Sequence, residues 1–77
     1  MIARMNFLIK AIDFKNNIFY ATPEDPQGLR HLSARDKAEI FKMKNQALKT
    51  IVSMKQTPEM RNYVFHIEGI DSNWTLT

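Results

Sequence analysis

FKMKNQALKTIVSMK, residues 41–55, is the stretch that decides the fold. It is made mostly of residues that favour a helix, and Thr57-Pro58 ends the run. Ser33 provides a hydroxyl that can cap the first turn of a helix. The sequence therefore predicts one long helix over residues 33–56.

The predicted helix has two apolar stripes, separated by lysines, when its residues are placed about 100° apart. The stripe that we expect to pack on a sheet consists of Ala34, Ala38, Phe41, Leu48 and Val52. The other stripe consists of Ile40, Met43, Ala47, Ile51 and Met54, and we expect its four larger residues, Ile40, Met43, Ile51 and Met54, to meet a partner. The lysines between the stripes, which we expect to flank that contact, are Lys37, Lys44 and Lys55. In the alternative interpretation, both stripes form one wide buried face and the lysine stems lie along it.

Alternating apolar and polar residues predict strands on both sides of the helix. The segment MNFLIKAID, residues 5–13, alternates, and KNN supplies turn residues before IFYAT resumes, which predicts a hairpin over residues 5–22. Prolines and a glycine make residues 23–32 a predicted loop. A second alternating run, NYVFHIE, followed by a turn and WTLT, predicts a hairpin over residues 62–77. The expected fold is α+β, in the order β-β-α-β-β, with a four-stranded antiparallel sheet and one long helix across one face.

One helix covers only one face of the expected sheet, so the other face presents a second candidate surface. Its expected members are Leu8, Lys10, Ile12, Phe19, Val64 and His66. An apolar patch of that extent often marks an interface. The alternative is that the loop at residues 23–32 covers part of this face with Leu29 and Leu32.

Composition limits the classes of protein to consider. The chain has 77 residues, which makes one domain, and it has no cysteine, which excludes disulfides and thiolate metal sites. The apolar fraction of 44% is typical of a globular domain. Without a signal-like segment or a membrane-length apolar run, we expect a cytoplasmic protein that makes no contact with a membrane.

The residues that commonly carry catalysis do not form a recognisable pattern. His31 and His66 fall on different predicted elements, and neither has acids at metal-ligand spacing. The two glycines cannot build a phosphate loop, and Glu24 and Asp25 are adjacent acids in a proline-rich loop. We therefore expect a protein without enzymatic activity, metal or cofactor.

Nucleic-acid binding is the second hypothesis, because the helix region is basic. Residues 33–57 contain six basic and two acidic side chains, which gives a net charge of +4. Aromatic residues on the strands offer surfaces on which bases can stack. Against this hypothesis, the lysines are distributed around the predicted helix, and the aromatics are needed for the core.

In its layout, the chain resembles the small anti-CRISPR proteins encoded by phages and other mobile elements. The similarity lies in an opening strand like NFLIKAI (residues 6–12), one helix, and a closing hairpin like NYVFHIEGIDSNW (residues 62–74). This resemblance implies a non-catalytic inhibitor that occupies a surface of a host defence complex, and it assigns no role to any residue.

Taken with the apolar stripes, this resemblance makes a protein-binding module the leading hypothesis. The partner is expected to be a host complex or a second copy of the chain in a homodimer, with nucleic acid as the alternative.

Overall fold

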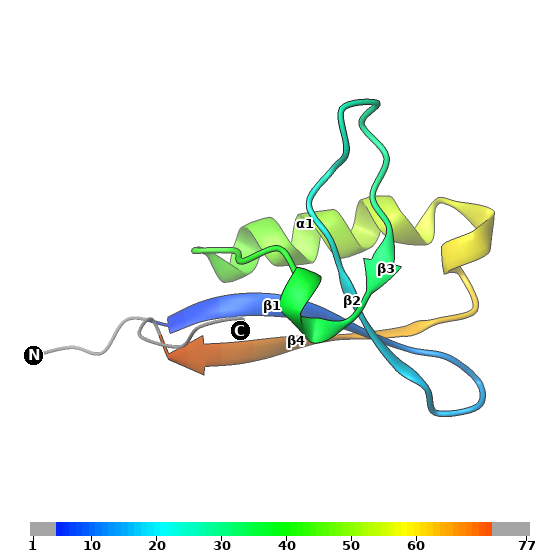
Figure 1. Ribbon diagram of the computed structural model, residues 1–77, viewed down its shortest axis with the longest axis horizontal. Helices are drawn as coiled ribbons and strands as arrows, with labels where there is room; N and C mark the ends of the chain where they lie inside the picture. Colours follow the sequence, from blue (N-terminus) through cyan, green and yellow to red (C-terminus); the bar gives the residue numbers. More distant parts are fainter. Residues whose placement is uncertain (1–4, 72–77) are drawn as a thin grey trace, which may run out of the picture.

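The computed structural model describes residues 5–71, and it shows an α+β fold in two layers (Figure 1). The strands are β1 (Met5–Ile12), β2 (Ile18–Ala21), β3 (Leu32–Ser33) and β4 (Val64–Asp71), and they form an antiparallel sheet in the order β3-β2-β1-β4. The helix α1 (Lys44–Lys55) lies across one face. Two short 3-10 turns, η1 (Arg35–Lys37) and η2 (Pro58–Met60), flank it in the chain. The predicted four-stranded antiparallel sheet with one helix is confirmed.

The first hairpin turns where the sequence predicts. The carboxylate of Asp13 accepts hydrogen bonds from the backbone N–H groups of Lys15 and Asn17 at 2.8 and 2.9 Å. Asn16 has a φ of 67°, a left-handed conformation that asparagine tolerates better than most residues. These local interactions connect β1 to β2 and fix the pairing of Ile12 with Ile18.

Strand β1 is the centre of the sheet, and both of its faces are covered over much of its length. All eight of its residues pair with β4, from Met5 opposite Asp71 to Ile12 opposite Val64. Ile9 faces the helix in a core with Phe41, Ala47, Ile51 and Met54. Leu8 faces the other way, in a smaller cluster with Tyr20, Ala38 and Ile70. The sheet therefore contributes to two hydrophobic clusters.

The helix begins eleven residues later than predicted, so the prediction of a helix over 33–56 was wrong at its N-terminal end. Ser33 pairs with Tyr20 as part of β3 and is not a helix cap. The backbone N–H of Phe41 donates to the carbonyl of Phe7, and the N–H of Phe7 donates to the carbonyl of Phe41, both at 2.8 Å. The N–H of Glu39 donates to the carbonyl of Ala21. Because these tertiary bonds need an extended chain, they override the local helix propensity of residues 38–41.

The face of α1 that meets the sheet also differs from the prediction. Ala47, Ile51 and Met54 are buried, whereas Leu48 and Val52 are 46% and 61% exposed. The assignment of Leu48 and Val52 to the core was therefore wrong. Phe41 is buried as predicted, but it is not part of the helix, so its burial says nothing about which side of α1 faces inward.

The remaining differences concern the predicted loop and the last hairpin. Leu32 lies in β3, at the end of the segment predicted as a loop over residues 23–32. The first strand of the predicted second hairpin, residues 62–77, is present as β4. The predicted return strand, with Trp74 and Leu76, lies outside the described residues. Within the described part, β3 is therefore the fourth strand.

Replacing Ile51 with alanine should destabilise the protein far more than replacing Leu48. Ile51 is packed in the core, and removing its side chain should cost about 2–5 kcal/mol. Leu48 is largely exposed, so Leu48→Ala should change the free energy of unfolding by less than about 0.5 kcal/mol. Denaturant melts of the two variants measure this difference. Equal losses, or a larger loss for Leu48→Ala, would contradict the observed orientation of α1.

Candidate interaction surface

One side of α1 carries exposed apolar residues between lysines. We call Lys44, Leu48, Val52 and Lys55 the lateral stripe. Lys44, Leu48 and Lys55 follow one another at i, i+4 and i+11, so they fall within about 40° of each other around the helix. Val52 is one turn beyond Leu48. All four side chains are exposed, which leaves an apolar centre with an ammonium group toward each end.

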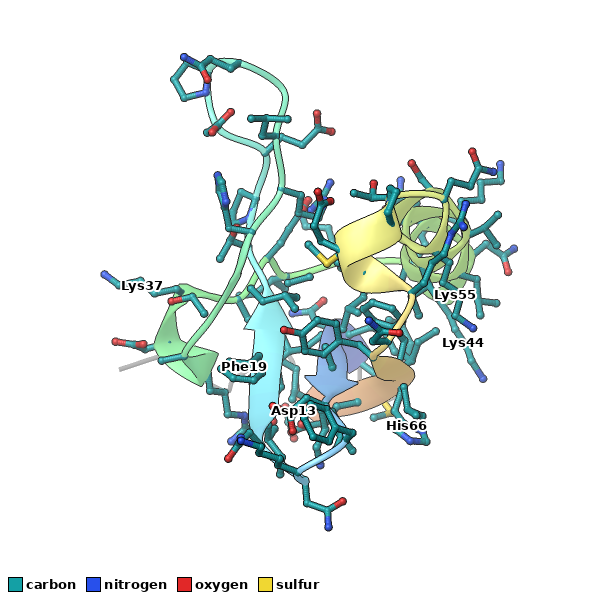
Figure 2. The ribbon with its side chains drawn as sticks, turned by 90° about the vertical axis from the view of Figure 1, so that its right-hand side faces the viewer. Asp13, Phe19, Lys37, Lys44, Lys55 and His66 are labelled. Atoms are coloured by element: carbon teal, nitrogen blue, oxygen red, sulfur yellow. The ribbon has the colours of Figure 1, made fainter. Side chains whose placement is uncertain are left out.

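The lateral stripe lies on the β4 side of the molecule. Figure 2 shows Lys44, Lys55 and His66 on the same side, and His66 belongs to β4, the last strand in the sheet order. The opposite side of the helix, with Lys49, Thr50 and Ser53, faces a groove. The stripe and the outer edge of β4 are therefore neighbours.

The backbone of β4 alternates between bonding to β1 and pointing outward. Phe7 directs its own N–H and carbonyl to Phe41, away from β4. Phe7 and its partner Gly69 are therefore a non-hydrogen-bonded pair, and the backbone groups of Gly69 point to the outer edge. Because the direction alternates from one residue to the next, the backbone N–H and carbonyl groups of Phe65 and Ile67 also point to the outer edge. No other described strand pairs with this edge.

The predicted contact residues on the helix divide into three groups. Lys44 and Lys55 belong to the lateral stripe, but Ile51 and Met54 are buried, so their assignment to a partner surface was wrong. Ile40 and Met43 are exposed as expected, although they precede the helix. Lys37, in η1, lies on the far side of the molecule from Lys44 and Lys55 (Figure 2). The three lysines therefore do not form one row.

The second predicted surface is only partly assembled. Lys10, Ile12, Val64 and His66 do share the face away from the helix, because Lys10 is paired with His66 and Ile12 with Val64. Leu8, by contrast, is fully buried, and its cluster includes Ala38.

Phe19 was also wrongly placed on this surface. It is paired with Ala11 on the helix side, and its ring meets the edge of Tyr63 at 6.1 Å between ring centres. The sequence reasoning missed Ile18, which is 52% exposed and lies beside Ile12. The alternation of side chains between the two faces of β2 was the sequence pattern that could have identified Ile18 as part of this surface.

The loop at residues 23–32 does not cover this face with Leu29, which is 54% exposed. A polar cluster instead lies over the face, next to Leu8. The hydroxyl of Tyr20 donates to Glu68 Oε1 at 2.7 Å, and Arg35 forms an ion pair with the other oxygen of that carboxylate. The Arg35 guanidinium also lies over the Tyr20 ring, 5.8 Å from its centre. This cluster joins β2 and β4 to η1.

A groove of about 710 Å³ separates the arm between β2 and β3 from α1 and η2. Asp25 shapes the arm by accepting the N–H groups of Gln27 and Leu29, both at 2.9 Å. The hydrogen bond from Leu29, with another from His31, holds the pKa of Asp25 below its usual value. Gly28 completes the turn with a φ of 80°.

In the groove, Arg30 and Glu24 form an ion pair with each other, and His31 is paired with Asp25 of the arm. Arg30 forms ion pairs with Glu24 and Glu39 and donates to the carbonyl of Thr22 at 2.9 Å. The hydroxyl of Thr50 donates to the carbonyl of Gln46 in its own helix. The contacts of Arg30 hold the arm in place.

Residues 5–71 hold no group of three or more His, Cys, Asp or Glu placed to bind a metal ion. In the same span, no helix has the length and apolar character needed to cross a membrane. No protein-family description, curated protein or solved structure matches the chain.

The pKa of Tyr20 provides a test of the polar cluster. Burial, the hydrogen bond to Glu68 and the charge of Glu68 all raise the pKa of the Tyr20 hydroxyl. Because the pKa of Tyr20 is higher in the folded than in the unfolded protein, the protonated hydroxyl contributes to the free energy of unfolding. This contribution is fully present below the usual tyrosine pKa, and it is lost as the pH rises through the pKa of the folded protein. Glu68→Gln should lower the pKa of Tyr20. Titration of tyrosinate absorbance, with Tyr20→Phe identifying the step, measures this. An unchanged titration in Glu68→Gln would contradict the described contact.

Proposed function

We propose that this chain is a non-catalytic protein-binding module whose docking surface is the lateral stripe of α1. The observation that carries the proposal is the exposure of Leu48 and Val52, which lie side by side on α1. Large apolar side chains that remain exposed beside one another on a small domain are a common feature of protein interfaces. Lys44 and Lys55 add charge at the rim, where it mainly steers association.

The charges define the chemistry of the partner. From Ile40 to Pro58 the chain has four lysines and no acid. A partner surface with an apolar centre and acidic side chains around it complements this arrangement. If the chain inhibits a host defence complex, as its layout resemblance implies, it therefore fits an acidic protein surface. A basic channel that holds nucleic acid would repel it.

Nucleic-acid binding is the second candidate, supported by the same lysines. The placement of these lysines favours nucleic-acid binding less than protein binding. Lys37 lies on the far side of the molecule, and Lys49 faces the groove. A phosphate backbone is best followed by a continuous basic track. We expect no tight oligonucleotide binding at physiological salt. A titration with a steep salt dependence, with a log–log slope of about −0.7 per neutralised phosphate on single strands, would favour this second function.

Adding a carboxylate to the centre of the lateral stripe should abolish partner binding without unfolding the protein. Leu48→Asp places a charge where the contact must be desolvated, and it leaves the buried side of α1 unchanged. The matched control is Gln46→Asp, which adds the same charge at an exposed position on the opposite side of the helix. The measurement is the amount of partner protein that the immobilised, purified chain captures from a lysate of the cells in which it naturally occurs. Melting temperatures are recorded for both variants.

Three results would count against this function. They are capture by Leu48→Asp equal to that by the wild type, loss of capture in Gln46→Asp alone, and the absence of any captured protein, including a second copy.

A further inference from the structure

A second cavity, of about 420 Å³, lies at the end of the molecule where the β1–β2 turn meets the segment between η2 and β4 (Figure 1). Asp13 and Phe14 line it from the turn, and Asn62 and Tyr63 line it from the other segment. Its volume is within the range of sites that hold small molecules. The residues around this one space supply two aromatic rings and a carboxylate, which are the groups that bind an organic cation.

We propose that this cavity binds a methylated ammonium group, either that of a small quaternary ammonium ion or that of a trimethylated lysine side chain. The rings of Phe14 and Tyr63 contact the methyl groups, and the carboxylate of Asp13 balances the positive charge. This site is additional to the docking surface proposed above, because none of its lining residues belongs to the lateral stripe or to the groove.

The ring of Phe14 already attracts a cation of its own chain. The Nζ atom of Lys15 lies 5.5 Å from the centre of this ring, which is within the range of a cation–π contact. Lys15 is not one of the residues that line the cavity, so its ammonium group approaches the ring from outside. Phe14 is 83% exposed and belongs to neither hydrophobic cluster, so packing within the described chain does not account for an aromatic residue here.

Tyr63 forms a fixed wall of the cavity. Its ring packs against Phe19 and Phe65, with 6.1 and 6.4 Å between ring centres. Its backbone N–H donates to the carbonyl of Met60 at 3.3 Å. A ring that is positioned before the ligand arrives loses little conformational entropy on binding.

Asp13 supplies charge but little free hydrogen-bonding capacity. Its Oδ1 atom accepts the N–H groups of Lys15 and Asn17 at 2.8 and 2.9 Å, and its Oδ2 atom accepts the side-chain amide of Asn17 at 3.0 Å. Desolvation acts to raise the pKa of Asp13, but these hydrogen bonds outweigh it and hold the pKa below its usual value, so the group is ionised at neutral pH. A carboxylate has about four acceptor positions, so a primary ammonium finds few of them open. A trimethylated ammonium has no N–H group to satisfy, so the site should prefer it.

The first test compares two ligands of equal shape and different charge. Choline and its uncharged isostere, in which a carbon atom replaces the nitrogen, are titrated into the protein while the resonances of Phe14, Asn62 and Tyr63 are followed by NMR. We expect saturable shifts with choline and a dissociation constant at least about 5-fold higher for the isostere, because the isostere lacks the charge. Equal affinities, or no saturable shift with choline, would overturn the proposal.

A peptide that contains trimethyllysine separates the two sources of the ligand. Tighter binding of this peptide than of choline identifies a protein side chain as the ligand, and equal binding identifies a free small molecule. Both results support the cavity as a site for methylated ammonium groups. The same peptide with unmodified lysine is the matched control. If it binds as tightly as the trimethylated peptide, the proposed preference is wrong and the proposal fails.

Two substitutions assign the binding to this cavity. Asp13→Asn removes the charge but keeps an oxygen for the N–H groups of the turn, and Phe14→Leu removes an exposed ring. Each should raise the dissociation constant for choline by roughly 3- to 10-fold. Phe14→Tyr keeps the ring and should bind like the wild type. Leu48→Asp should also bind like the wild type, which separates this test from that of the docking surface.

Phe14→Leu decides the question alone if Asp13→Asn changes the fold of the turn. Choline binding that is the same in the wild type and in Phe14→Leu would place the ligand elsewhere and contradict the proposal.

Discussion

The pair of backbone hydrogen bonds between Phe7 and Phe41 is the constraint on which the rest of the structure depends. Each is 2.8 Å long, and together they fix residue 41 as a short extension of the sheet beside β1. An extended residue 41 cannot be helical, so α1 begins only at Lys44. The Phe41 ring then enters the core from outside the helix, and Ala47, Ile51 and Met54 complete that core from within it.

The same constraint determines what the surface presents. With Ile51 turned inward, Leu48 and Val52 face outward on the β4 side, next to the edge of β4 with which no other strand among residues 5–71 pairs. The arm between β2 and β3 is fixed on the other side of the helix, since Arg30 lies 5.8 Å from the centre of the Phe41 ring and forms an ion pair with Glu39. The groove side therefore carries the ion pair of Arg30 with Glu24, and the β4 side carries the exposed side chains of Leu48 and Val52.

Much of the sheet could be predicted from the sequence because its signals are local. The alternation of β1 and β4 and the turn at Asn16 and Asn17 all act within a few residues. The end of the helix was also predictable, because Pro58 prevents its continuation. Its beginning was not, since the partner of Phe41 is 34 residues away in the chain. Counting Phe41 as a helical residue then exchanged the inner and outer faces of the helix, so Leu48 and Val52 were expected inside and Ile51 and Met54 outside.

The most direct test of this account is the backbone chemical shifts of residues 34–55 in the folded protein. The Cα shift of each residue reports whether its φ and ψ angles are extended or helical. We expect extended values at Ala38 and Phe41 and a continuous helical run only from Lys44 to Lys55. A continuous helical run from Ala34 through Lys55 would contradict it, because the pairing of Phe7 with Phe41 and the orientation of α1 would then both be wrong.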